Sequence, residues 1–127
     1  MEAPKKILLV DDEEANHYIA QRVLQKLEVE AEMLNAKNGR EALDIVKEVC
    51  QREQCPELIL LDINMPVMNG FEFLEELQHS AVLSSAPIKI VLLTSSMHFQ
   101  DLARAQEYPV IDFIEKPLTP EKLAKFL

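Results

Sequence analysis

Short aliphatic runs recur along this chain and alternate with longer stretches in which apolar residues follow a helical spacing. The runs lie near residues 5–10, 30–35, 57–62, 88–94 and 110–114. We expect each run to form a buried strand, because continuous Val, Ile and Leu are typical of parallel sheets covered on both faces. Strands that alternate with helical segments predict repeated βα units.

The stretch 39–53 carries the clearest helical pattern, and Asn38 with Glu41 three residues later resembles a capping pair at its start. The segment 99–106 has the weakest apolar stripe, formed by Phe99, Leu102, Ala103 and Gln106, so we expect its helix to be the least firmly held. Thr119 and Pro120 predict the start of a final helix, which reaches the chain end after about two turns. That helix is either naturally short or cut from a longer protein.

Composition narrows the class of protein. A chain of 127 residues is the size of one domain, and 48% hydrophobic with 6% aromatic residues indicates an aliphatic core. The net charge of −9 argues against direct nucleic-acid binding, which needs a clustered basic face. No apolar run of about 18 residues and no leader-like N-terminus is visible, so we expect a cytoplasmic protein that does not enter the membrane.

Two cysteines, Cys50 and Cys55, are five residues apart with no second pair and no histidine cluster nearby. This spacing suggests neither a zinc site nor a disulfide framework. We therefore expect two reduced thiols, as is usual in the cytosol.

Four of the aliphatic runs end in residues that can handle phosphate or a metal: Asp11 and Asp12, Asp62, Thr94, and Lys116. In an open parallel sheet the carboxyl ends of the strands meet along one edge, where such folds hold ligands. We therefore expect these five side chains to converge.

Three carboxylates at one edge repel one another, and a hard divalent cation relieves that repulsion. Mg²⁺ suits this set best, because it prefers oxygen ligands and is usually held by one or two carboxylates plus a phosphate. A carboxylate can then attack a phosphoryl group to give an aspartyl phosphate. Asp62 is the best candidate nucleophile, since it ends the most continuous apolar strand and would lie centrally.

The sequence resembles a known family at four places: LVDDE at 9–13, LLDINMPVMNG at 60–70, Thr94-Ser95, and Lys116-Pro117-Leu118. In this order and spacing they are similar to the CheY-like receiver domain of two-component response regulators, and the resemblance covers essentially the whole chain. It implies a doubly wound (βα)5 flavodoxin-like fold with a five-stranded parallel sheet in the order 2-1-3-4-5. We expect residues 1–127 to form one stand-alone receiver domain.

The resemblance also implies a role for each site residue. Asp62 would accept a phosphoryl group from a sensor histidine kinase or a histidine phosphotransfer protein. Asp11 and Asp12, with the backbone carbonyl of Asn64, would bind Mg²⁺ together with Asp62. Thr94 would bond the phosphoryl group and Lys116 would pair with it through a cis Lys116-Pro117 peptide.

Phe113 falls at the family's switch aromatic, although a plain half-buried aromatic of an edge strand remains equally open. Its neighbour Asp112 also favours an edge strand. Output would then pass through the fourth helix, fifth strand and fifth helix, to a downstream protein or a second copy of the chain. The small residues Asn64 and Ser96, two beyond Asp62 and Thr94, predict a phosphate that lasts minutes rather than days.

Two other functions compete with this prediction. A phosphatase of the haloacid dehalogenase superfamily uses similar residues, but its nucleophile comes first in the chain and its acidic pair last, whereas Asp11 and Asp12 come first here. A receiver-like interaction module that works without phosphorylation would not need all five site residues. His17, His79 and His98 show no ligand spacing, so we expect all three on the surface.

Overall fold

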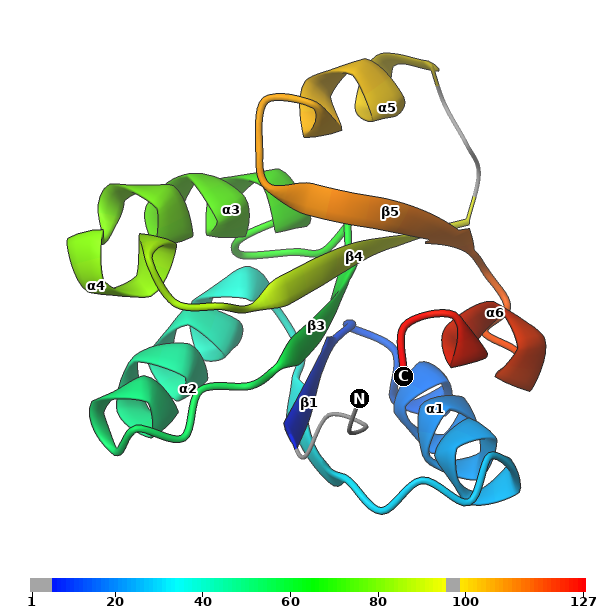
Figure 1. Cartoon of the computed structure of the whole chain (residues 1–127). Coiled ribbons are helices and arrows are strands. Elements are labelled where there is room, and N and C mark those ends of the chain that lie inside the picture. Colours follow the sequence, from blue (N-terminus) through cyan, green and yellow to red (C-terminus); the bar gives the residue numbers. More distant parts are fainter. Residues whose placement is uncertain (1–5, 96–98) are drawn as a thin grey trace.

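The strands form one parallel sheet in a computed structural model that describes residues 6–95 and 99–127, except the side chains of Val82 and Phe99. The sheet order is β2-β1-β3-β4-β5, as predicted (Figure 1). The strands span β1 Lys6–Val10, β2 Glu32–Ala36, β3 Leu58–Asp62, β4 Lys89–Thr94 and β5 Val110–Glu115. The doubly wound fold class is thereby confirmed.

Helices connect successive strands and cover both faces of the sheet (Figure 1). They span α1 Glu14–Lys26, α2 Gly39–Gln51, α3 Gly70–His79, α4 Ala81–Ser84, α5 Phe99–Ala105 and α6 Pro120–Ala124. The single turn α4 was not predicted, because four residues are too few to show a helical period. It is capped by the Ser80 hydroxyl, which accepts a hydrogen bond from the Leu83 N–H.

Alternate residues of each central strand enter opposite cores, as the two-residue period of a strand requires. In β1, Leu8 and Val10 join the cluster beneath α2, α3, α4 and α5, whereas Ile7 and Leu9 join the cluster beneath α1 and α6. All five residues of β3 are buried. This central strand therefore fixes the place where Asp62 leaves the sheet.

Besides α4, three helix starts among the described residues are defined by side-chain caps. Asn38 accepts from the Glu41 N–H, as predicted, and Thr119 accepts from the Lys122 N–H with Pro120 in the first turn. Asn69 and Glu72 form a reciprocal capping box at the start of α3. This cap fixes the start of the helix that follows the loop after Asp62.

The stripe predicted for the fourth helix is wrong in part. Ala103 and Gln106 are exposed, and the buried residue is Ala105, which is 2% exposed. The helix α5 ends at Ala105, so Gln106 lies beyond it, and Arg104 packs over the Phe71 ring of α3 at 4.4 Å. A seven-residue helix that contacts its neighbour through its last turn gives too little periodic pattern to identify its buried side.

The prediction of two reduced thiols is also wrong, since Cys50 and Cys55 form a disulfide with their Cα atoms 4.3 Å apart. The helix α2 ends at Gln51, and Glu53 adopts a positive φ of 60°. The chain thus turns back and brings Cys55 beside the last helical turn. The prediction rested on the usual state of cytosolic cysteines and could not foresee this turn.

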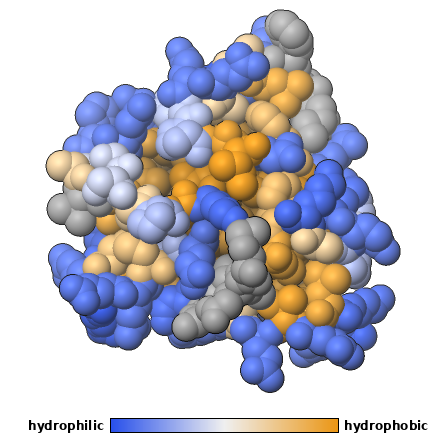
Figure 2. Space-filling view, viewed as in Figure 1, coloured by the Kyte–Doolittle hydropathy of each residue, from blue (hydrophilic) through white to orange (hydrophobic). Residues whose placement is uncertain are grey.

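Hydrophilic residues lie around most of the rim in the view of Figure 2, and hydrophobic residues gather near its centre and toward its lower right. Within the described ranges, none of the helices has both the length and the apolar character needed to cross a membrane.

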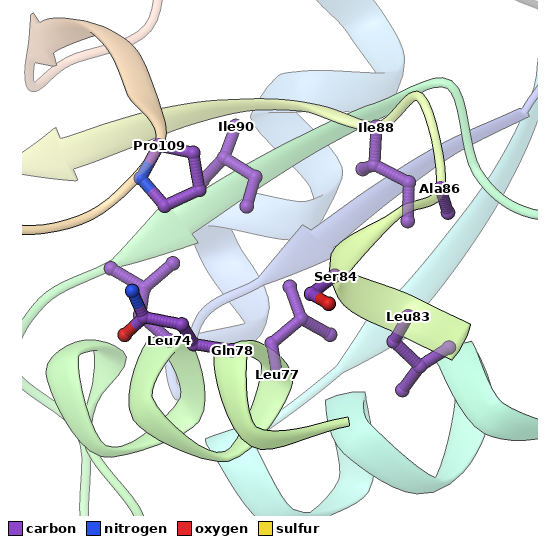
Figure 3. Close-up of a pocket in the computed structure, with 9 residues that line it drawn as sticks. All are labelled: Leu74, Leu77, Gln78, Leu83, Ser84, Ala86, Ile88, Ile90 and Pro109. Carbon is purple, nitrogen blue, oxygen red and sulfur yellow. The ribbon is translucent and has the colours of Figure 1, made fainter. Parts of the chain in front are cut away.

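A cavity of about 320 Å³ lies between α3, α4 and the beginning of β4 (Figure 3). Leu74 and Leu77 point toward it from α3, and Ile88 and Ile90 point toward it from the strand side. Leu83 of α4 also lines it. It opens at the edge where β4 and β5 begin, opposite the edge where Asp62 and Thr94 lie. This apolar cavity is therefore separate from the polar residues at the carboxyl ends of the strands.

We predict that Gly70→Ala lowers the free energy of unfolding by about 1–3 kcal/mol, the usual cost of overpacking a core. A Cβ atom at Gly70 would lie 2.6 Å from the backbone oxygen of Asp62 and 3.0 Å from the Ile63 Cα, and backbone atoms cannot move aside cheaply. Urea denaturation measures the change, with the exposed Lys47→Ala of α2 as a control. An unchanged denaturation midpoint for Gly70→Ala would contradict the tight contact.

Candidate functional site

The carboxyl ends of β1 and β3 and the residue after β5 bring Asp11, Asp62 and Lys116 together. Lys116 Nζ lies 2.9 Å from Asp11 Oδ2 and 3.2 Å from Asp62 Oδ2. Asp12 completes the cluster, since one carboxylate oxygen from each of the three acids falls within 4.8 Å of the others. The predicted convergence of the strand-end acids with the lysine is therefore observed.

Thr94 ends β4 and is only 4% exposed. It pairs with Glu115 across the sheet, and its backbone oxygen accepts a hydrogen bond from the Lys116 N–H at 2.8 Å. The register of β4 and β5 thus places Lys116 immediately beside Thr94. The Lys116-Pro117 peptide that follows is cis, as expected.

The carboxylate of Asp11 is fully buried and held by three donors. Its Oδ1 accepts from the Glu13 N–H at 2.9 Å, and its Oδ2 accepts from Asn16 Nδ2 at 3.0 Å in addition to Lys116. Asp12, by contrast, is exposed. The two adjacent acids therefore differ: Asp11 is anchored within the protein and Asp12 faces the solvent.

Asp62 is 5% exposed at the end of the buried central strand. Burial raises the pKa of its carboxyl, Lys116 opposes that rise, and Asp11 adds to it, with a raised pKa as the net result. The Asn64 N–H donates to Asp62 Oδ1 at 3.3 Å. Ionisation of Asp62 is thus less favourable here than in a solvent-exposed aspartate, and additional positive charge would oppose that effect.

Lys116 is half-buried, and burial alone would lower its pKa. Its hydrogen bonds and charge interactions with Asp11 and Asp62 outweigh burial, so its pKa is raised and the ammonium keeps its proton. Three carboxylates beside one ammonium leave an excess of negative charge. The all-oxygen donor set fits a hard divalent cation such as Mg²⁺, with Asp11, Asp12 and Asp62 as the residues that could hold it.

The loop between β3 and α3 forms another side of the site. Val67 at its tip is 80% exposed and has a φ of 68°, a conformation that β-branched residues rarely adopt. The next residue, Met68, is tied to the start of α2, because its backbone oxygen accepts from the Gly39 N–H at 2.8 Å. Neighbouring structure thus holds this loop near Asp62.

The other predicted residues lie on the edge strand, in the loop after Asp62 and on the surface. Phe113 is half-buried on the edge strand β5 and packs against the core beneath α3, and Asn64 is exposed in the loop after Asp62. His79 is exposed, as expected. Ser96 and His98 lie outside the described residues.

The prediction for His17 missed a specific contact. His17 is half-buried, with Nε2 2.8 Å from the Asp11 backbone oxygen and Nδ1 2.7 Å from Asn35 Oδ1. Sequence reasoning also overlooked Asn16, which bonds the Asp11 carboxylate. Both residues belong to the first turn and a half of α1, and their only signal in the sequence is closeness to the acidic pair.

Comparison with known proteins agrees with this geometry. The sequence model of the response regulator receiver domain family matches residues 7–127 of this chain. Histidine protein kinase 1 of Candida albicans is 33% identical over 127 residues, which are 98% of this chain and 5% of that much longer protein. Response regulator Rcp1 of Synechocystis is 31% identical over 126 residues, which cover 98% of this chain and 84% of Rcp1.

Solved structures show the same likeness in three dimensions. The Mn²⁺-bound form of Rcp1 has a TM-score of 0.75 at 31% identity, covering 96% of this chain and 88% of that one. The phosphorylated cyanobacterial phytochrome response regulator RcpA has a TM-score of 0.79 at 30% identity, covering 97% of this chain and 88% of that one. With the family model matched over nearly its whole length, the chain belongs to the response regulator receiver domain family.

Proposed function

We propose that this protein is a phosphorylation-controlled switch in which Asp62 accepts a phosphoryl group from the phosphohistidine of a sensor kinase or phosphotransfer protein. The observation that carries the proposal is the Asp62 carboxylate at the end of the central strand, beside the Asp11-Asp12 pair and 3.2 Å from Lys116 Nζ. Receiver domains are signalling switches rather than turnover enzymes. The related RcpA, moreover, has been solved in a phosphorylated form.

The transfer uses an oxygen of Asp62 as nucleophile. That oxygen forms a bond to phosphorus while the P–N bond of the phosphohistidine breaks, and the electron pair returns to the ring nitrogen, which takes up a proton. The product is an acyl phosphate on Asp62, which water later hydrolyses to inorganic phosphate and a free carboxylate. Lys116 stays protonated, so its ammonium can stabilise the incoming negative charge from within the cluster.

Asp11, Asp12, Asp62 and the backbone carbonyl of Asn64 would hold Mg²⁺, which would supply charge neutralisation for the transferred phosphoryl group. The relative Rcp1 has been solved with Mn²⁺, a divalent ion of similar oxygen preference. In this chain Asp12 is the accessible acid, whereas Asp11 is engaged by its protein donors. Asp12 is therefore the acid most open to direct coordination, and Asp11 supports it.

Thr94 and Phe113 would carry the signal away from Asp62. Thr94 lies at the end of β4 next to the lysine, where its hydroxyl can donate to a phosphoryl oxygen. Movement of Thr94 would make room for the half-buried Phe113 ring of β5 to turn inward. The surface formed by α5, β5 and α6 would then change and be recognised by a downstream protein or by a second copy of the chain.

The alternative is a receiver-like interaction module that works without phosphorylation. The assembled cluster of acids, lysine and buried threonine favours the phosphorylated switch, because an interaction module gains nothing from burying a carboxylate with a raised pKa.

We predict that acetyl phosphate with Mg²⁺ adds one phosphoryl group to the wild-type protein and none to Asp62→Asn. The amide cannot form the acyl phosphate, so the loss should be complete. Intact-protein mass spectrometry measures the added group, and size-exclusion chromatography on the same samples records any change of oligomeric state.

Asp44→Asn is the matched control, because Asp44 is an exposed acid on α2 away from the cluster. It should be labelled like the wild type. Absence of labelling in the wild type would favour the interaction module, and sustained turnover of a phosphate monoester would favour a phosphatase.

We also predict that Asp62→Asn is more stable than the wild type at neutral pH when divalent ions are chelated. Since the pKa of Asp62 is raised on folding, the folded state binds this proton more tightly than the unfolded chain. The ionised carboxylate therefore costs stability above the folded-state pKa, and that cost disappears as the pH falls through it. The stability difference between the two proteins should accordingly shrink on acidification.

Urea denaturation at a series of pH values measures this difference, with Asp44→Asn again as the control. A difference that stays constant or grows as the pH falls would contradict the raised pKa.

A further inference from the structure

Two adjacent residues of α1, Asn16 and His17, hold Asp11 at two different places. Asn16 Nδ2 donates to the carboxylate oxygen Oδ2 at 3.0 Å. His17 Nε2 lies 2.8 Å from the backbone oxygen of the same residue, and a carbonyl can only accept, so the ring N–H donates. The side chain and the main chain of Asp11 are thus both fixed from one turn of one helix.

The edge strand β2 completes this support. The Asp11 N–H donates to the Ala36 backbone oxygen at 3.0 Å, and His17 Nδ1 lies within hydrogen-bond distance of the Asn35 side-chain amide. His17 therefore bridges the end of β1 and the end of β2. Its ring sets the orientation of the peptide group that joins Asp11 to Asp12.

We propose that Asn16 and His17 are positioning residues that preorganise the Asp11-Asp12 pair for a divalent cation and so set the metal affinity of the site. The inference rests on the function proposed above. Neither residue would touch the phosphoryl group or the reacting atoms. They would act through the geometry of the two acids.

Three carboxylates within 4.8 Å repel one another, and an unsupported chain would relieve the repulsion by turning Asp12 away. The His17 contact prevents this, because rotation of the Asp11–Asp12 peptide group would break the hydrogen bond to the Asp11 oxygen. Partners that orient metal ligands in this way typically change metal affinity by about 10–100-fold when they are removed.

Packing does not account for the choice of His17. The residues of α1 that enter the core are Ala20, Val23 and Leu24, whereas His17 belongs to neither core cluster. Truncating its ring would leave this packing in place. We therefore expect truncation of His17 to lower the affinity for the metal and to leave the stability of the fold largely unchanged.

The test is the Mg²⁺ dissociation constant at one fixed pH, measured by isothermal titration calorimetry on the unphosphorylated protein. We expect His17→Ala and Asn16→Ala to weaken Mg²⁺ binding about tenfold or more. His17→Gln, whose amide can still donate to the Asp11 oxygen, should recover much of the affinity. The exposed Gln21→Ala on the same helix is the control and should bind like the wild type.

A second readout separates positioning from general damage. At saturating Mg²⁺ the rate of labelling by acetyl phosphate should stay close to that of the wild type in His17→Ala, while the Mg²⁺ concentration for half-maximal labelling rises. If His17→Ala does not fold, Asn35→Ala decides, because it removes the other partner of the ring from an exposed site. It should also weaken Mg²⁺ binding.

The outcomes distinguish the two proposals. A wild-type protein that binds no Mg²⁺ overturns the proposed function, and the inference with it. Equal Mg²⁺ affinities for the wild type and the folded variants, with Mg²⁺-dependent phosphorylation intact, overturn the positioning role alone. Equal weakening by His17→Ala and His17→Gln would also overturn it, since the shared hydrogen bond would then be irrelevant.

Discussion

The contact of Lys116 with Asp11 and Asp62 is the interaction on which the site depends. Without the ammonium, two carboxylates buried at neighbouring strand ends would face each other in a medium that screens charge poorly. With it, the pKa of Asp62 is still raised, because the charge of Lys116 does not compensate for burial and for the nearby Asp11. The site therefore carries more negative than positive charge, and a bound divalent cation would offset the excess.

The sheet brings the acids close together because it fixes the positions of the strand ends from which they extend. The fully buried β3 fixes Asp62, and the register of β4 with β5 sets Lys116 beside Thr94. The close approach of Gly70 to the Asp62 backbone then fixes where α3 begins. The packing of the two aliphatic cores thus holds the acids close together against their mutual repulsion.

The convergence of Asp11, Asp62 and Lys116 could be predicted because it depends only on strand ends and chain order. The contacts of His17 could not, because they depend on the angle at which α1 leaves the acidic loop, and a lone histidine gives no periodic signal. The Cys50–Cys55 disulfide was also missed, because it depends on the backbone turn after α2, which the sequence pattern does not indicate. Pattern identifies the elements, whereas such contacts depend on how two elements meet.

The unequal exposure of Asp11 and Asp12 has a consequence for how the site can respond. The Asp11 carboxylate already accepts from three protein donors, two on Oδ2 and one on Oδ1, so Oδ1 is the oxygen with room for a cation. Asp12 is exposed and can approach a cation with little structural cost. Lys116 is the Asp11 partner best able to move, because it already divides its contacts between Asp11 and Asp62. A phosphoryl group on Asp62 would draw the ammonium toward itself, and Asp11 would remain fixed by Glu13 and Asn16.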